Sequence, residues 1–231
     1  MTLTPVPPSV TKGIYQVGGS NYSDGKDASV FLVDVGEGNS VMIDSGAGEG
    51  VDAIFDNMML CSLEPAGLHT LILTHCHIDH IGGASRIKEE TGCKIIAHEL
   101  DSDVIENGND RATAAGWYGI DYIPIKVDIR ISGEKEKIQI GTMEFTFLHT
   151  PGHTPGSMVV VIDTQEGKVL FGQDIHGPFD PDFGSDISKW RHSMEMLMEL
   201  DADILCEGHF GTYRPKKKVR EYIQGYLSRY R

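Results

Sequence analysis

The segment that decides the fold spans residues 74–83 and reads THCHIDHIGG. It follows the apolar run His69–Leu73, which is typical of a buried strand. Three histidines and one aspartate fall within six positions, and alternate side chains of an extended segment point to the same side. Side chains that bind metals and lie this close together have little use in packing, so we expect a metal site. These side chains are His75, His77, Asp79 and His80.

Three further segments place a metal-binding side chain just after an expected strand. They are TPGHTPGS with His153, FGQD with Asp174, and EGH with His209. Each is weak alone, because a PGH sequence is more often a turn than a ligand. Loops at the ends of strands commonly carry reactive groups on a rigid scaffold. Together and in this order, the segments strengthen the prediction of a metal site.

The motif HxHxDH, followed by His153, Asp174 and His209, resembles that of the metallo-β-lactamase superfamily, from the first strands to His209. The resemblance implies an α/β fold, an αββα sandwich of two mixed β-sheets with helices on the outer faces. Residues 1–231 would form a single domain with a two-metal site at one sheet edge. The implied ligands are His75, His77 and His153 for the first metal, Asp79, His80 and His209 for the second, and Asp174 bridging both.

Two divalent cations with these ligands would lower the pKa of a shared water and polarise a carbonyl oxygen. We therefore predict a metal-bound hydroxide that attacks a small thioester or ester/lactone carbonyl. Zinc is the first choice of metal, with iron or manganese as alternatives. Asp79 also faces the water and would assist proton transfer, and His176 could donate a proton to the leaving group. The alternative for His176 is a loop histidine without a catalytic role.

Single positions narrow the branch within the superfamily. The PGHTPGS segment and Asp174 after the strand ending at Phe171 are most similar to the glyoxalase II-like hydrolases. Two features depart from glyoxalase II, namely Ile175 after the aspartate and the short segment 210–231 after His209. Gly177 stands where acyl-homoserine lactonases have a tyrosine, so their tyrosine-assisted mechanism is in doubt. The substrate stays open between thioesters, lactones and phosphoesters.

Two other functions fit the same motif. A mononuclear-iron persulfide dioxygenase-like oxidoreductase would hold iron through His75, His153 and Asp174. A non-catalytic, metal-binding ligand sensor would keep the ligands without turnover. Metal analysis combined with turnover of thioesters or uptake of O₂ distinguishes the three.

Composition excludes several classes of protein. The formal net charge is −14, from 20 Lys and Arg against 34 Asp and Glu, which argues against nucleic-acid binding. No apolar run is long enough for a membrane-spanning helix. The start MTLTPVPPSV lacks a cationic region and an apolar core, so we expect no secretory signal and a cytoplasmic protein. The expected partner is a small molecule, and a homodimer is left open. The cysteines read as reduced thiols: Cys61, Cys76, Cys93 and Cys206.

Several other residues are expected to lie near the metal site. Basic residues between Arg214 and Arg220 form either a solvated helix face or a clamp for an anionic substrate. Asp44 is expected to support a ligand loop, and segments 100–120 and 177–186 could act as lids. Aromatic residues predicted at the rim, each more readily explained by packing, are Tyr22, Trp117, Tyr118, Phe179, Phe183 and Tyr213.

Strands and helices alternate along the chain in two rounds. We expect strands at residues 13–17, 29–35, 40–43, 69–73, 94–97, 137–140, 143–149, 157–163, 168–171 and 204–206. We expect helices at 51–60, 79–90, 187–200 and 215–231, and helical pieces within 99–118.

Overall fold

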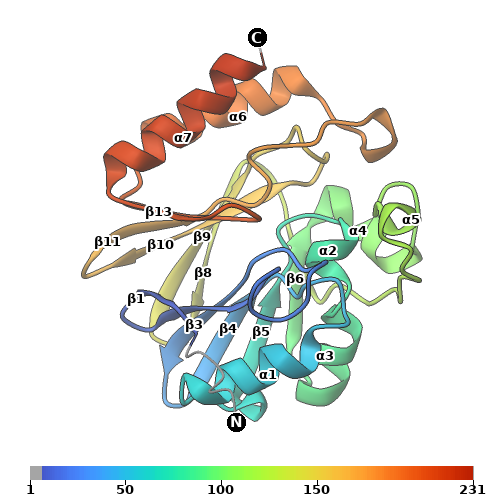
Figure 1. Ribbon diagram of the computed structural model, residues 1–231, viewed down its shortest axis with the longest axis vertical. Helices are drawn as coiled ribbons and strands as arrows, with labels where there is room; N and C mark the ends of the chain where they lie inside the picture. Colours follow the sequence, from blue (N-terminus) through green and yellow to red (C-terminus); the bar gives the residue numbers. More distant parts are fainter. Residues whose placement is uncertain (1–6, 231) are drawn as a thin grey trace.

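Two β-sheets lie face to face, and helices cover the outer face of each in this computed structural model, which describes residues 7–230 (Figure 1). The layers are helices, sheet, sheet and helices. This is the αββα sandwich that the motif implied, and both sheets are mixed.

The first sheet has seven strands that lie side by side in chain order. They are β1 (Ser9–Thr11), β2 (Ile14–Gly18), β3 (Val30–Gly36), β4 (Asn39–Ile43), β5 (Leu68–Ile72), β6 (Lys94–His98) and β7 (Ile129–Ile131). The pairs from β1 to β4 are antiparallel, and those from β4 to β7 are parallel. The helices on this side are α1 (Val51–Leu60), α3 (Ala84–Thr91) and α4 (Glu99–Asn107).

The second sheet has six strands in the order β13-β12-β11-β10-β9-β8. They are β8 (Lys135–Ile140), β9 (Met143–His149), β10 (Met158–Thr164), β11 (Gly167–Phe171), β12 (Ile204–Glu207) and β13 (Gly211–Tyr213). Its outer face carries α6 (Ile187–Leu200) and α7 (Lys216–Arg229). Single helical turns occur at α2 (Ile78–Ile81), α5 (Ala115–Tyr118), Pro65–Gly67 and Pro181–Phe183.

Alternation of side chains along the strands produces the apolar layers. On β3, Leu32 packs toward α1, whereas the neighbouring Phe31 and Val33 point into the space between the sheets. The ring of Phe31 lies 5.5 Å from that of Phe171 on β11. Because both faces of the first sheet are buried, the central strands β3 to β6 are apolar at most positions.

The prediction of one helix at residues 79–90 is wrong in one respect, because this segment forms two helices, α2 and α3. Gly82 and Gly83 separate them, and both pack against the loop after β4. A Cβ at Gly82 would lie 2.1 Å from the Ala47 carbonyl oxygen, and one at Gly83 2.3 Å from that of Ser45. Only glycine allows this approach, so the chain changes direction directly after the metal motif.

The other elements agree with the pattern, and α1 and α6 have the predicted bounds. Three short strands, β1, β7 and β13, were not predicted. Residues 1–6, where the absence of a secretory signal was expected, and Arg231 at the end of the last predicted helix lie outside the described residues. Within 7–230, no helix has the length and apolarity needed to cross a membrane. All four cysteines are free thiols.

Candidate metal centre

Side chains from the ends of strands in both sheets meet at one edge of the sandwich. His75 and His77 follow β5 of the first sheet. A backbone hydrogen bond from Met158 N to the Thr74 carbonyl oxygen (2.9 Å) connects the loop that carries them to β10 of the second sheet. His153 lies between β9 and β10, and Asp174 follows β11. The expectation that strand ends would present these groups together is met.

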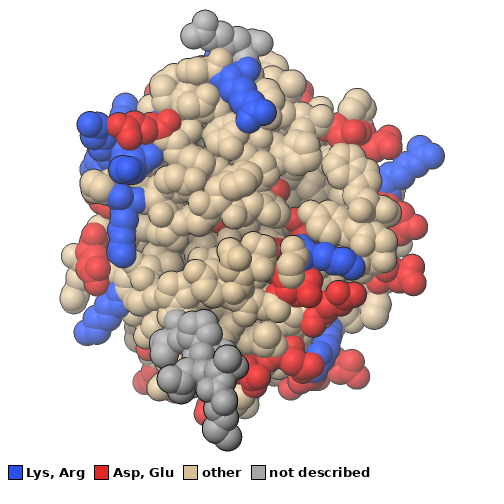
Figure 2. Space-filling view, in the orientation of Figure 1, with Lys and Arg blue, Asp and Glu red and all other residues tan. Residues whose placement is uncertain are grey.

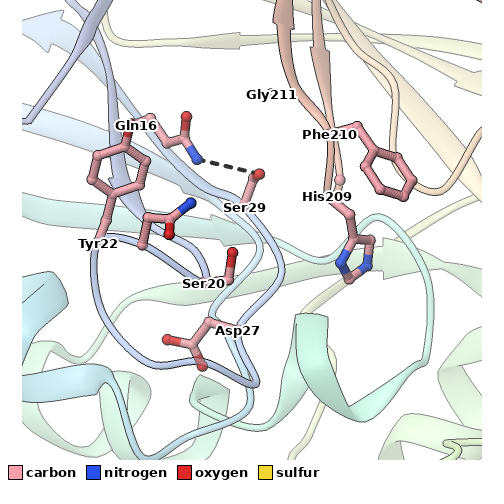
Figure 3. Close-up of a pocket in the computed structure, with 10 residues that line it drawn as sticks. Gln16, Ser20, Tyr22, Asp27, Ser29, His209, Phe210 and Gly211 are labelled. Atoms are coloured by element: carbon pink, nitrogen blue, oxygen red, sulfur yellow. Dashed lines mark hydrogen bonds between the residues drawn. The ribbon is translucent and has the colours of Figure 1, made fainter.

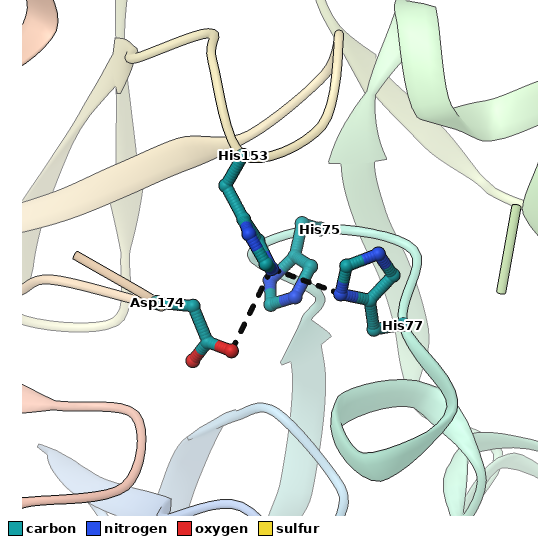
Figure 4. Close-up of side chains that lie close together, drawn as sticks. All are labelled: His75, His77, His153 and Asp174. Atoms are coloured by element: carbon teal, nitrogen blue, oxygen red, sulfur yellow. Dashed lines mark hydrogen bonds and ion pairs between the residues drawn. The ribbon is translucent and has the colours of Figure 1, made fainter. Parts of the chain in front are cut away.

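The seven predicted ligand residues form two groups that share Asp174. Within each group, the potential ligand atoms lie within 4.8 Å of one another. We call the group of His75, His77, His153 and Asp174 the first cluster (Figure 4). We call the group of Asp79, His80, Asp174 and His209 the second cluster.

In the first cluster, ring nitrogens converge on one point. His77 Nδ1 lies 2.9 Å from His153 Nε2, which lies 3.6 Å from Asp174 Oδ2 (Figure 4). His153 Nδ1 donates to the Pro178 carbonyl (2.8 Å), which leaves Nε2 free as a ligand. The buried Nε2 of His75 has no hydrogen-bond partner among the described residues. Buried polar atoms are rarely left unpaired, so this arrangement fits the coordination of a cation.

In the second cluster, carboxylates surround the imidazoles. His209 Nε2 lies 3.2 Å from Asp79 Oδ2 and 3.3 Å from Asp174 Oδ2. His80 Nε2 lies 3.1 Å from Asp174 Oδ1, and its Nδ1 donates to Asp44 Oδ2 at 2.8 Å. Asp44 also accepts from the backbone N–H of Thr74 (2.8 Å). It therefore supports both the ring of His80 and the loop before it, as the sequence predicted.

The two clusters differ in the protonation of their histidines. Burial lowers the pKa of His75 and His77 well below its usual value, and that of His153 to about 4, so these rings are neutral. In the second cluster, burial also opposes charge, but the neighbouring carboxylates outweigh it. They raise the pKa of His80 well above its usual value and that of His209 to about 10. A cation bound here would therefore compete with the protons of these two rings.

The donor set suits divalent metal ions. Imidazole nitrogens and carboxylate oxygens are ligands of zinc, and iron and manganese accept them as well. The first cluster offers three imidazoles and a carboxylate, and the second offers two of each. These groups, together with the unpaired buried nitrogens, fit a site for divalent cations.

Asp101 on α4 is a supporting residue that the sequence analysis missed. Its buried carboxylate accepts from Cys76 N (3.1 Å), Thr154 Oγ1 (2.7 Å) and Gly156 N (2.7 Å). It thereby joins the loop that carries His75 and His77 to the loop that carries His153. The only signal was its spacing, since Asp101 shares a helix face with the buried Ile105 four residues later.

A cavity of about 370 Å³ opens beside both clusters. Asp79, Asp174 and His209 reach its wall, and His176 lines it with Nδ1 held by Glu207 Oε1 at 2.9 Å. A smaller polar pocket of about 240 Å³ lies on the other side of His209, where Gln16, Ser20 and Ser29 face it (Figure 3).

The predicted rim residues divide into two sets. Trp117, Tyr118 and Phe183 line the cavity, and Tyr22 lines the polar pocket. The expectation of packing is wrong for Tyr118, because its hydroxyl donates to Asp79 Oδ2 at 2.9 Å. Phe179 packs against Trp190 and Tyr213 against Tyr222, outside the residues that line the cavity. Cys76, which lies within the metal motif, is buried and belongs to neither cluster.

The basic segment lies away from the cavity. Lys216 and Arg220 form ion pairs with Asp201 at the end of α6, and Arg214 donates to the Val10 carbonyl. Figure 2 shows Lys and Arg side chains gathered at the left edge, where α7 begins in Figure 1. None of these residues lines the cavity, so the solvated helix face is the interpretation that agrees with the structure.

Comparison with known proteins gives one consistent family. A model of the metallo-beta-lactamase superfamily matches residues 24–209. Hydroxyacylglutathione hydrolase GloC of Haemophilus influenzae is 33% identical over 154 residues, covering 63% of this chain and 70% of that protein. Acyl-coenzyme A thioesterase MBLAC2 of Gallus gallus is 26% identical over 246 residues, covering 94% of this chain and 84% of that protein.

A solved structure shows the same fold. The metallo-beta-lactamase GOB-18 from Elizabethkingia meningoseptica superposes with a TM-score of 0.80 at 22% identity, over 98% of this chain and 89% of that one. The family model spans most of the chain, and the relatives named above are hydrolases by name. The protein therefore belongs to the metallo-beta-lactamase superfamily.

Proposed function

We propose that this protein is a dinuclear metal-dependent hydrolase that cleaves a small thioester, or an ester or lactone. The observation that carries the proposal is the pair of clusters that share Asp174 beside an open cavity. His75, His77 and His153 would hold one cation, and zinc is the first choice. The second cation would be held by Asp79, His80 and His209, with Asp174 between the two.

Residues of the chain then have distinct tasks in the cavity. When bound, two divalent cations supply an activated water and polarise the substrate carbonyl. The Asp79 carboxylate, which reaches the cavity wall and accepts from Tyr118, takes the proton that the attacking water loses. Glu207 holds the ring of His176 through Nδ1, which leaves Nε2 to protonate the leaving group.

The names of the relatives support an acyl substrate. The Haemophilus influenzae protein is named for hydroxyacylglutathione and the Gallus gallus protein for acyl-coenzyme A. Both names describe hydrolysis at an acyl group, so we place thioesters first among the substrates to be tested. A mononuclear iron oxygenase would use only His75, His153 and Asp174, so the number of metal ions per chain distinguishes it from the proposed hydrolase.

The test is metal analysis of protein purified without added metal, together with a panel of thioesters and lactones and a measurement of O₂ uptake. We expect two metal equivalents per chain, hydrolysis of at least one thioester, and no O₂ uptake. One iron per chain with O₂ uptake would contradict the proposal. Tight metal binding without any turnover would contradict it as well, and would favour a sensor.

A further inference from the structure

Among the described residues, the wall of the cavity contains no Lys or Arg side chain. Apart from histidines, the ionisable residues that line it are Asp79 and Asp174, both members of the clusters, and Tyr118. The adjoining polar pocket adds only a third carboxylate, that of Asp27. Proteins that bind carboxylate or phosphate groups usually supply Arg or Lys for this purpose. Here an anionic part of a substrate would find no Lys or Arg partner in the wall.

Apolar rings occupy the mouth of the cavity instead. Trp117 is 63% exposed and Phe210 is 56% exposed, although large aromatic side chains are normally buried. Both line the cavity, together with Phe183. Exposed apolar groups that gather at a hollow commonly mark a binding surface.

The rings are placed close to the clusters. Trp117 packs against Phe183 with ring centres 4.8 Å apart, and Phe183 lies 4.3 Å from the ring of His77 in the first cluster. On the side of the second cluster, Phe210 lies 4.7 Å from the ring of His176, which itself lies 5.1 Å from His209. A group attached to a carbonyl at the clusters would therefore lie against aromatic rings.

We propose that the cavity selects substrates with a neutral, apolar acyl chain, and that Trp117 and Phe183 form the subsite for that chain. This rests on the proposed hydrolase function. In the reaction, water adds to the carbonyl carbon, the carbon–sulfur bond breaks, and the thiol leaves with a proton. The acyl chain takes no part in this chemistry, so its contacts with the rings determine affinity. Burial of apolar surface against a tryptophan supplies that affinity.

The test uses thioesters of N-acetylcysteamine, a small neutral thiol, that carry acetyl, butanoyl, hexanoyl or succinyl groups. We expect kcat/KM to rise at least about tenfold from acetyl to hexanoyl, mainly through a lower KM. Succinyl, which has the same chain length as butanoyl but carries a carboxylate, should be the poorer substrate of that pair. Equal values for acetyl and hexanoyl, or a preference for succinyl, would overturn the subsite.

Substitution of Trp117 tests whether its ring causes the preference for the longer acyl chain. Trp117→Ala should lower kcat/KM for hexanoyl about tenfold and leave acetyl within about twofold, because acetyl is too short to reach the ring. Ile123→Ala is the matched control, since Ile123 is also 63% exposed but does not line the cavity. An equal loss with both substrates in Trp117→Ala would contradict a role in recognising the chain.

A binding measurement separates this proposal from the proposed function. The S-hexyl and S-(2-carboxyethyl) thioethers of N-acetylcysteamine cannot be hydrolysed, and calorimetry gives their Kd for the metal-loaded protein. Tighter binding of the hexyl compound, weakened in Phe183→Ala, supports the subsite even if no thioester is cleaved, in which case only the hydrolase function fails. Equal binding of both compounds overturns the subsite even if hydrolysis occurs.

Discussion

The two clusters lie side by side and share Asp174, yet their histidines differ in protonation. The imidazoles of the first cluster are neutral because burial outweighs the opposing effect of the Asp174 carboxylate, so they can accept a cation directly. The imidazoles of the second cluster are held as cations by carboxylates, so a metal ion must displace protons to enter. One site is therefore ready for metal at neutral pH, and the other depends on pH.

The support of the two clusters differs as well. Asp44 touches a ligand ring directly, through His80 Nδ1 in the second cluster. Asp101 touches no ligand ring and instead holds the backbone of the two loops that carry the first cluster. We therefore expect loss of Asp44 to act on one metal, and loss of Asp101 to act on the position of whole loops.

The largest effect is expected at the shared residue. Asp174→Ala removes a ligand from both clusters, so we expect kcat to fall by about 10³-fold or more and metal content to drop below two equivalents. Asp163→Ala, which removes an exposed carboxylate from β10, is the control. Full activity with two metals in Asp174→Ala would show that the two clusters do not act as one site.

Next in size is the effect of pH on the second metal. His80 and His209 have raised pKa values, so they carry protons at neutral pH and must lose them on binding. We expect the affinity for the second equivalent to fall about tenfold per displaced proton for each pH unit below 8, whereas the first stays nearly constant down to pH 5. Titrations with Zn²⁺ against a competing chelator at pH 6, 7 and 8 measure this. The same dependence of affinity on pH for both equivalents would contradict the proposed difference between the clusters.

Asp44→Asn should act on the second cluster alone. The variant keeps the size of the side chain but removes the charge that holds His80 Nδ1. Loss of the group that hydrogen-bonds a ligand histidine commonly lowers metal affinity by about 10- to 100-fold. We expect a loss of that size in the affinity for the second metal equivalent. Asp56→Asn, an exposed carboxylate on α1, is the matched control. An equal loss at both equivalents would assign Asp44 to the whole site.

The smallest effect on metal affinity is expected for Asp101→Asn. One carboxylate oxygen would be replaced by an amide nitrogen, which cannot accept from a backbone N–H, so the variant leaves a buried donor unpaired. We expect the free energy of unfolding to fall by about 1–3 kcal/mol and kcat to fall several-fold, with both metals retained. Thermal unfolding and metal analysis check this. Selective loss of the first metal would mean that Asp101 tunes a ligand directly.

The candidate ligand residues and most strands and helices could be predicted because their signals are local, whereas the grouping of the ligands came from the family resemblance. The run from His75 to His80 follows one apolar strand, and the PGH and FGQD segments follow others. The bounds of α1 and α6 could be predicted because each helix has one apolar face and clear ends. These features need no knowledge of which strand pairs with which.

What could not be predicted depends on contacts between distant segments. The break at Gly82 arises from the loop at Ala47, and nothing in the local pattern marks it. Likewise, Asp101 and Tyr118 lie 25 and 39 positions from Cys76 and Asp79, the residues that they contact. Trp117 looked like packing because its exposure follows from the fold and cannot be read from its neighbours in sequence.

The origin of the ligands in both sheets has a further consequence. His75 and His77 belong to the half of the chain that ends at β7, and Asp174 and His209 to the half that begins at β8. Cations bound between them would act as crosslinks, since binding to the native state alone adds about 4 kcal/mol of stability at a thousandfold excess over Kd. Chelation should therefore lower the melting temperature as well as the activity. A chain whose cysteines are all free would then have its two halves joined at the edge of the sandwich that holds the two clusters.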